Sequence, residues 1–295
     1  MNTYSKIIGL GFLVLLCSPL QAADIYVGNA GNNTIVRFDA NGQGTVFADA
    51  SSGINQPYGL AADSSGNLYV ANVGNNTILK FDSSGHGTVF VSSGLSTPTG
   101  MAFDQAGYLY VANSANSTIA RFDPYGNGAV FATAGLNNPV GLAFDSHGNL
   151  YAANEFVATI QKFDSNGNGS LFASSGMNGP YGLAMDRFDN LFVANAGNNS
   201  ISKFTPGGQG SIFANFGLSN PTHLAFDNSG NLYEVNYGNN TVGKLDSNGA
   251  VSLFANSHLS HPVSIAVVPE TSTTGILALG VCVLIAQRLR RRLAA

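Results

Sequence analysis

The sequence predicts an all-β fold, a six-bladed β-propeller in which every blade is a four-stranded antiparallel sheet. Two observations lead to this prediction. One unit of sequence begins again every 41 residues, at Pro57, Pro98, Pro139, Pro180, Pro221 and Pro262. Within a unit, four short apolar runs alternate with turns made of Gly, Asn and Asp. A four-strand repeat of roughly 40 to 45 residues is typical of propeller blades.

The unit that starts at Pro57 shows the four expected strands, which are 59–61, 68–71, 77–81 and 88–91. These runs are rich in β-branched and aromatic residues, as strands are. The turns between them supply Gly, Asn and Asp, which accept the positive φ that tight hairpins need. A helical unit is excluded because Gly, Asn or Pro interrupts each window of 11 or more residues inside it.

The ring is predicted to close through its two ends. The second strand of the unit recurs six times, beginning at residues 24–29, and the first strand also recurs six times, ending at 263–267. The predicted order of strands along the propeller therefore begins with a second strand and ends with a first strand. We expect the last strand to complete the first blade, which would remove the exposed sheet edges of an open ring.

The consensus unit P-x-G-L-A-x-D-x-x-G-N-L-Y-V-A-N-x-x-N-N-x-I-x-K-F-D resembles the NHL repeat of six-bladed propellers over about residues 24–268. The resemblance implies the fold and says little about activity, since related propellers include streptogramin lyases and lactonase-type hydrolases. One position departs from the family, which often has Asp where these blades have Asn72, Asn113, Asn154, Asn195 and Asn236. With Asn29, these six amides are expected to hydrogen-bond nearby backbone in turns rather than to form a polar ring.

Three regions divide the chain. Residues 1–22 resemble a secretory signal peptide, with Lys6 before an apolar run of 11 residues and a small-residue cleavage site at Ala22. Residues 23–268 are the propeller, which contains neither of the two cysteines, Cys17 and Cys282. Burial between blades, rather than disulfides, must therefore stabilise it.

The C-terminal tail, residues 269–295, resembles a PEP-CTERM sorting signal of Gram-negative bacteria. The motif Val268-Pro269-Glu270-Thr271 precedes an apolar run of 12 residues and an arginine cluster. The resemblance implies an exosortase-type processing enzyme as a partner, transient membrane anchoring, and final location at the cell surface or in the extracellular matrix. The short run and the cytoplasmic preference of arginine agree with this orientation. The alternative is a plain C-terminal membrane anchor.

The charge of the predicted propeller limits its partners. Residues 24–268 hold 15 Asp and Glu against 7 Lys and Arg, a net charge of −8. Nucleic-acid binding depends on phosphate neutralisation by Lys and Arg, so nucleic acid is not an expected partner.

The sixth unit breaks the repeat twice. His223 replaces the Gly of earlier units, and Glu234 replaces a Val or Ala. The hairpin between them is expected to place His223 opposite Asn236 and Ala225 opposite Glu234, so that His223, Glu234 and Asn236 share one face near the channel mouth. Imidazole, carboxylate and amide oxygens can hold a divalent metal. The alternative is a buried His–Glu pair that serves packing.

Two further features are candidate binding residues. Glu155 and Phe156 stand in a loop where other units have x-Gly, and they could contact a partner. Tyr58 and Tyr181 follow the prolines of their units and are expected on the same end of the ring, where they suit carbohydrate or peptide stacking.

Two functions are consistent with these features. The first is an exported, non-enzymatic propeller that binds an extracellular protein or polysaccharide, with no cofactor. The second is a metal-dependent enzyme of the streptogramin lyase or lactonase type, for which the residues of the sixth unit would be the metal site. No nucleophile motif supports acyl transfer, and near-regular repeats favour the binding module.

Overall fold

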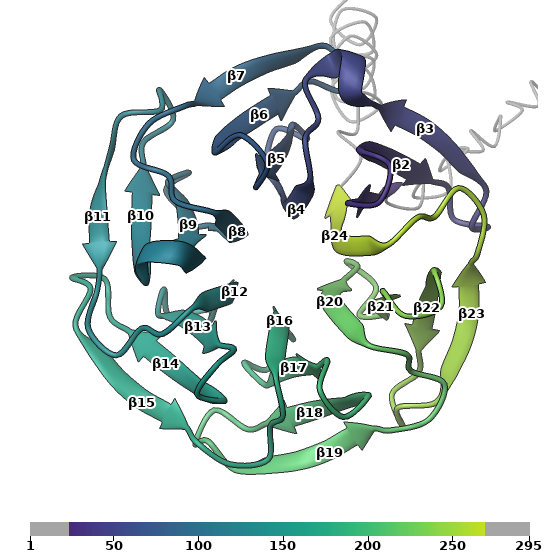
Figure 1. The fold of residues 1–295 in the computed structure, drawn as a ribbon. Helices are drawn as coiled ribbons and strands as arrows, with labels where there is room; N and C mark the ends of the chain where they lie inside the picture. The colour runs from purple at the N-terminus through teal and green to yellow at the C-terminus, as the bar shows by residue number, and fades with distance from the viewer. Residues whose placement is uncertain (1–23, 269–295) are drawn as a thin grey trace, which may run out of the picture.

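The computed structural model describes residues 24–268, which form six four-stranded antiparallel sheets around a central channel (Figure 1). The predicted all-β propeller is confirmed. From the channel outward, the blades are β24 (Pro262–Val268), β1 (Asp24–Asn29), β2 (Thr34–Phe38), β3 (Gly44–Ala48); β4 (Pro57–Ala62), β5 (Leu68–Asn72), β6 (Thr77–Phe81), β7 (Gly87–Val91); β8 (Pro98–Phe103), β9 (Leu109–Asn113), β10 (Thr118–Phe122), β11 (Gly128–Ala132); β12 (Pro139–Phe144), β13 (Leu150–Asn154), β14 (Thr159–Phe163), β15 (Gly169–Ala173); β16 (Pro180–Met185), β17 (Leu191–Asn195), β18 (Ser200–Phe204), β19 (Gly210–Ala214); β20 (Pro221–Phe226), β21 (Leu232–Asn236), β22 (Thr241–Leu245), β23 (Val251–Ala255). Two single-turn 3-10 helices, η1 (Ala50–Ser52) and η2 (Ser114–Asn116), lie in loops.

The ring closes through its ends, as the repeat count predicts. β24 pairs antiparallel with β1, from Asp24 opposite Val268 to Asn29 opposite Pro262. The last strand therefore supplies the innermost strand of the first blade. This pairing ties the two ends of the described chain together without a disulfide.

The core lies between the blades and is aromatic. Tyr69 of β5 packs edge-on between Phe90 and Phe103 of the same and the next blade, with ring centroids 5.1 and 4.9 Å apart. Phe47 of β3 crosses the seam to Phe81 of β6, whose side chain is fully buried. Buried apolar area stabilises by about 25 cal/mol per Å², so these repeated seams hold the ring together.

The loops fall on two opposite faces that differ in charge. Because neighbouring strands are antiparallel, the hairpins joining first to second and third to fourth strands lie at one end of each blade. We call this end the Asp face, because eleven of the 15 acidic residues of the propeller occupy its hairpins: Asp39, Asp63, Asp82, Asp104, Asp123, Asp145, Asp164, Asp186, Asp189, Asp227 and Asp246. The carboxylate of Asp63 shows their role, since Oδ1 accepts the backbone N–H groups of Ser65 and Asn67, both at 2.9 Å.

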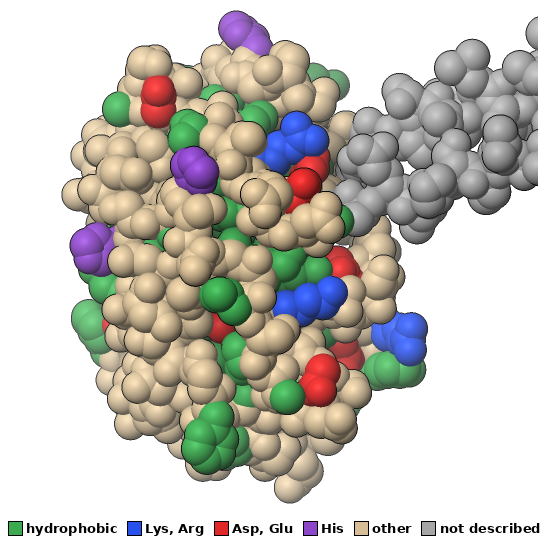
Figure 2. Space-filling view, turned by 90° about the vertical axis from the view of Figure 1, so that its right-hand side faces the viewer, with side chains coloured by type: hydrophobic (Ala, Val, Ile, Leu, Met, Phe, Trp, Pro, Cys, Tyr) green, Lys and Arg blue, Asp and Glu red, His purple; other side chains and the backbone are tan. Residues whose placement is uncertain are grey.

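The opposite end is called the Asn face and consists of loops such as 72–77 and 92–98. Within residues 24–268, Asp49 and Glu155 are the only Asp, Glu, Lys or Arg residues in its loops. The basic residues lie at the other end, either one position before the last residue of the third strands or, for Arg187, in a hairpin. Figure 2 shows the lysine and arginine side chains gathered toward one side of the ring.

Side-chain hydrogen bonds join neighbouring blades on the Asn face. In the loop after the second strand, the side chain of a residue with positive φ accepts a hydrogen bond from the backbone N–H of the next blade's entry loop. The Asn76 oxygen accepts from Thr97 at 2.7 Å, and the Asn33, Asn199, Asn240 and Ser117 side chains do the same at 2.6 to 3.2 Å. The seam between the blades β12–β15 and β16–β19 has Ala158 at this position, which offers no acceptor.

Replacing Ala158 by Asn is expected to stabilise the protein by about 1 kcal/mol. Asn tolerates the φ of 49° that Ala158 adopts, and its oxygen could accept the N–H of Gly179 as the other seams do. Urea unfolding measures the change, and Ala158→Gly is the control because Gly relieves the backbone without supplying an acceptor. An Asn variant no more stable than the Gly variant would contradict the role given to these bonds.

Candidate functional site

The mouth of the channel on the Asn face is lined by two variable positions of the repeat. One follows the proline of each first strand and is occupied by Tyr58, Thr99, Val140, Tyr181, Thr222 and Val263. The other follows the asparagine that ends each second strand and is occupied by Ala30, Val73, Ser114, Glu155, Ala196 and Tyr237. The framework between these positions is nearly constant. Differences in what the mouth could bind therefore reside in these two rings of side chains.

Three aromatic side chains and one carboxylate meet at this mouth. Tyr58 begins β4 and Tyr181 begins β16, and these strands face each other across the channel (Figure 1). Both tyrosines lie close enough to Glu155 and Tyr237 for their charges to interact. The structure thus brings together the predicted residues Tyr58, Tyr181 and Glu155.

The mouth is only partly shielded from solvent, since Tyr237 is 37% exposed and Tyr58, Tyr181 and Glu155 are half-buried. Burial raises the pKa of the Tyr181 phenol far above its usual range, and the neighbouring Tyr58 raises it further. Burial also raises the pKa of Tyr58. Burial likewise raises the pKa of the Glu155 carboxyl, although a hydrogen bond of 2.8 Å from the Asn138 amide partly offsets the shift. The phenols are therefore neutral donors at physiological pH.

Tyr237 is a member of this cluster that the sequence reasoning missed. Its ring lies 5.0 Å from the ring of His261, which enters from the loop before β24. The signal was present in the sequence, because Tyr237 occupies the same repeat position as Glu155. Comparing the six residues that follow the repeated asparagines would have identified both.

Phe156 lies beside Glu155 but projects outward. Its side chain is 75% exposed. Phe156 lies in the same loop as Ala158, where the seam to the next blade also lacks its connecting hydrogen bond.

The predicted register of the sixth unit is wrong. His223 pairs with Val235 and Leu224 pairs with Glu234, because the hairpin closes with Phe226 opposite Leu232, one residue away from the expected register. A bulge between Pro221 and His223 then places Pro221 opposite Asn236. Directly paired residues share a face of the sheet, and successive residues alternate. His223 therefore lies on the Val235 face, whereas Glu234 and Asn236 lie on the other face.

His223 lines the channel. A cavity of about 410 Å³ in the channel is bounded by His223 and by inner-strand residues of other blades. The Nδ1 atom is buried and has no hydrogen-bond partner among the described residues. Burial lowers the pKa of His223 to about 4, so the imidazole is neutral at physiological pH.

Glu234 is fully buried in the seam with the preceding blade. Its Oε1 atom accepts a hydrogen bond of 2.7 Å from the Asn236 amide. Its Oε2 atom has no hydrogen-bond partner within the described residues. Gly243 on the next strand leaves the space, because a Cβ there would lie 2.3 Å from Oε1. Burial raises the pKa of Glu234 to about 8.

The repeated asparagines bind backbone, as predicted, and do so across the unit rather than locally. Asn72 accepts the N–H of Asn55 at 3.0 Å and donates to the carbonyl of Gly53 at 3.0 Å and to Thr77 at 3.2 Å. Each asparagine thus fixes the entry loop of its own blade. Asn195 and Asn236 are exceptions, since the Asn195 amide donates to Ser200 and Ser202, and the Asn236 amide donates to Glu234, instead of to a loop carbonyl.

The three residues proposed for a metal do not converge. His223 is separated from Glu234 and Asn236 by the thickness of the sheet. In residues 24–268 no group of three or more His, Cys, Asp or Glu side chains is placed to hold a metal ion. The predicted signal peptide 1–22 and residues Pro269, Glu270 and Thr271 of the predicted sorting motif lie outside the described residues, whereas Val268 ends β24.

The described part of the chain holds no helix long and apolar enough to cross a membrane.

Comparisons with known proteins agree with the fold. Residues 55–81 match the NHL repeat family. The propeller is similar to a chain of a nidogen/laminin complex, with 21% identity, a TM-score of 0.75, and coverage of 83% of this chain and 98% of that one. No curated protein matches the sequence.

Two enzymes share the fold at lower similarity. A virginiamycin B lyase from Staphylococcus aureus, crystallised inactive with quinupristin, gives 17% identity and a TM-score of 0.63 over 82% of this chain and 87% of that one. A gluconolactonase from Xanthomonas campestris gives 21% identity and a TM-score of 0.61 over 73% and 83%. At these identities the likeness concerns the fold alone. The chain is thus a six-bladed β-propeller with an NHL repeat at residues 55–81.

Proposed function

We propose that this protein is an exported binding module that holds an uncharged extracellular polysaccharide against its Asn face. The observation that carries the proposal is the tyrosine and carboxylate cluster at the channel mouth, set in a face almost free of charge. Neutral sugars bind to proteins through aromatic rings and through hydrogen-bonding groups such as amides, hydroxyls and carboxylates. All of these are present at the mouth formed by Tyr58, Tyr181, Tyr237 and Glu155.

The positions of the chain ends support this role. Asp24 and Val268 are paired at the Asp-face end of the first blade, so both ends of the described chain lie on the Asp face. A tail that is held at a membrane, and then processed by an exosortase-type enzyme, would leave the Asn face pointing outward. Export by a Gram-negative bacterium and location at the cell surface or matrix belong to this proposal.

A protein partner is the main alternative for the same face. The most extensive structural likeness reported above is to a chain of a nidogen/laminin complex. The polysaccharide is favoured because arginine is enriched in protein interfaces, and the loops of the Asn face offer no lysine or arginine within 24–268.

Affinity electrophoresis in gels containing a neutral or an acidic polysaccharide tests the function. The wild-type protein is expected to be retarded by a neutral glucan or galactan, with little dependence on salt, and not by an acidic polymer such as alginate. Tyr181→Ala and Tyr58→Ala should each weaken retardation about tenfold, and Glu155→Gln should weaken it several-fold.

Tyr125→Ala is the matched control, because Tyr125 is 88% exposed and lies in a hairpin of the Asp face. It should leave retardation unchanged. Retardation by no neutral polymer, or retardation that the mouth variants leave unchanged, would contradict the proposal. Binding of a protein partner lost in the same variants would assign the face to protein instead.

A further inference from the structure

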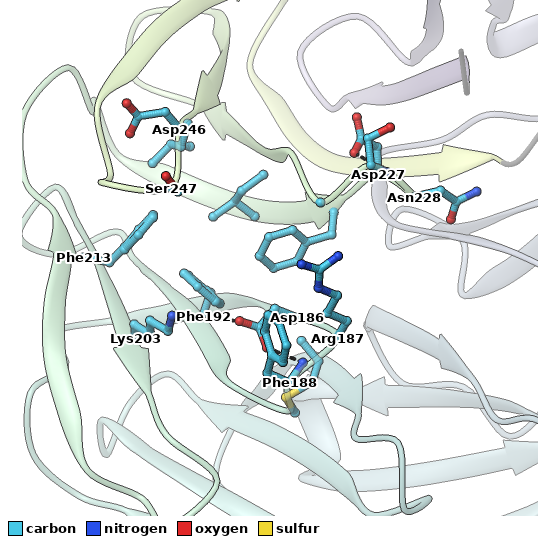
Figure 3. A pocket seen from close by; sticks show the side chains of 16 residues that line it. Asp186, Arg187, Phe188, Phe192, Lys203, Phe213, Asp227, Asn228, Asp246 and Ser247 are labelled. Carbon is cyan, nitrogen blue, oxygen red and sulfur yellow. Dashed lines mark hydrogen bonds and ion pairs between the residues drawn. The ribbon is translucent and has the colours of Figure 1, made fainter. Parts of the chain in front are cut away.

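A second candidate site lies on the Asp face, remote from the channel mouth. A cavity of about 550 Å³ opens between the blades β16–β19 and β20–β23 (Figure 3). Its volume is within the range of small-molecule sites, about 300 to 1,000 Å³. Its walls come from the hairpins that follow β16, β20 and β22, and its floor contains Phe192, Phe213 and Phe226.

The floor of this groove is more apolar than the corresponding position of other seams. Five blades have a tyrosine at the position of Phe192, namely Tyr26, Tyr69, Tyr110, Tyr151 and Tyr233. The hydroxyl of Tyr151, for example, donates a hydrogen bond of 3.2 Å to the hairpin aspartate Asp145. Phe192 removes this hydroxyl and leaves a hydrocarbon surface.

The rim of the groove carries two large residues where other blades have small or polar ones. Arg187 and Phe188 replace pairs such as Ser64-Ser65 and Asn228-Ser229. The guanidinium carbon of Arg187 lies 4.8 Å from the centroid of the Phe188 ring. Phe188 is 64% exposed, so the two side chains stand above the groove rather than packing into the core.

The hairpin that bears them is fixed from behind. Asp189 takes the positive-φ position that glycine holds in the other first hairpins, with φ of 59°. Its carboxylate accepts both the backbone N–H and the hydroxyl of Ser146 in the preceding blade, each at 2.8 Å. The rim is therefore held in place before any ligand arrives, which lowers the cost of binding.

Opposite charges face each other across the groove. Within residues 24–268 no acidic side chain forms an ion pair with Arg187, whereas Lys203 lies 3.9 Å from Asp186. Figure 3 shows Asp246 and Arg187 on opposite sides of the groove, with apolar side chains between them. The Oδ1 atom of Asp246 accepts the N–H groups of Asn248 and Ala250.

The second oxygen of Asp246 lacks a partner that two of its counterparts have. Asn127 and Asn168 donate their amides to Oδ2 of Asp123 and Asp164 at 2.9 and 2.8 Å. Ala250 stands at the equivalent place and cannot donate. The departures from the repeat, Phe192, Arg187, Phe188 and Ala250, thus converge on one groove.

We propose that this groove binds a short apolar peptide with free ends. Its carboxylate contacts Arg187, its ammonium group contacts Asp246, and an aromatic or aliphatic side chain packs on Phe192. Arginine pairs with carboxylates through two parallel hydrogen bonds, which favours it as the anion-binding group. A free amino acid fits less well, because its two charges are adjacent while those of the groove lie on opposite sides of the apolar floor.

Titration calorimetry of the full-length protein with the tripeptide Phe-Ala-Phe tests this site. The free tripeptide is expected to bind with a dissociation constant below about 1 mM. Amidation of its carboxyl group should weaken binding about tenfold, and acetylation of its amino group should weaken binding several-fold. Arg187→Gln should bind the acid and the amide equally, and Asp246→Asn should bind the free and acetylated forms equally. Phe192→Tyr, which restores the repeat, should weaken all of them.

Arg121→Gln is the matched control, because Arg121 also stacks on an aromatic ring, that of Tyr108 at 5.1 Å, but in another seam. It changes the net charge equally and should leave the affinities unchanged. Equal affinity for acid and amide in the wild type, no saturable binding, or a loss of affinity in the control would overturn the proposal. Free phenylalanine binding as tightly as the tripeptide would overturn the assignment to peptide. None of these outcomes bears on polysaccharide binding at the Asn face.

Discussion

Replacing Glu234 by Gln is expected to abolish a loss of stability that the wild-type protein suffers as the pH rises. The folded pKa of this carboxyl is raised from 4.5 to about 8 by burial. The folded protein therefore retains a proton that the unfolded chain releases above about pH 4.5. The associated stability is complete below pH 4.5 and is lost progressively up to about pH 8, by on the order of 4 kcal/mol in all.

The free energy of unfolding is compared between pH 6.5 and 9, because this range distinguishes the contribution of Glu234 from that of His223. The folded pKa of His223 is lowered from 6.5 to about 4, so its contribution is present above pH 6.5 and is lost only as the pH falls toward 4. Between pH 6.5 and 8 the wild-type free energy of unfolding should fall by about 2 kcal/mol relative to the Gln variant. Urea unfolding at several pH values measures this difference.

Glu155→Gln is the control for this prediction. Its carboxyl also has a raised pKa, but it is only half-buried and hydrogen-bonded to Asn138. A smaller pH dependence is expected there. Equal slopes for the wild type and the Glu234→Gln variant would show that the carboxyl ionises in the folded seam, with water or another group solvating it.

The fold was predictable because its determinants are local and repeated. The 41-residue period gives the number of blades, and the offset between the first-strand and second-strand copies gives the closure of the ring. The strand bounds also follow the apolar runs closely, since the turns that end them need Gly, Asn or Asp. Each unit predicts the same four strands, so a strand that is ambiguous in one unit can be assigned from the other units.

The site was predictable only in part, and the register of the hairpin explains the failure. The hairpin of the sixth blade closes with Phe226 opposite Leu232, so that His223 faces Val235 and not Asn236. A shift of one residue moves a side chain to the other face of a sheet. The β4–β5 hairpin closes in the same way, with Ala62 opposite Leu68, so this register belongs to the unit, but no residue type in the sequence reveals it.

The mouth cluster had a clearer signal. Tyr58 and Tyr181 were identified because they follow the prolines, and Glu155 because its loop departs from the consensus. Tyr237 was missed because its loop otherwise keeps the consensus. Variation at one repeat position is thus more informative about binding than disruption of a whole loop, since the framework positions the variable side chains in the same way in each blade.

The second large effect is expected for Asn72→Asp, which installs the residue that NHL units often carry. Asn72 is fully buried and uses both ends of its amide, with the oxygen accepting from Asn55 and the nitrogen donating to Gly53. A carboxylate would keep the first bond but would place a lone pair against the Gly53 carbonyl. The expected cost is about 2 to 4 kcal/mol, because a buried charge and an unpaired acceptor are created together.

Asn75→Asp is the matched control, since Asn75 is exposed on the same loop and its oxygen only accepts from Thr77, at 2.8 Å. That substitution should change the free energy of unfolding by less than about 0.5 kcal/mol. The buried variant should also recover stability below pH 4, where the new carboxyl is protonated and can donate a hydrogen bond to the Gly53 carbonyl. A variant as stable as the wild type at neutral pH would show that the amide nitrogen is dispensable. The six asparagines would then be explained by their acceptor role alone, which Asp could fill equally well.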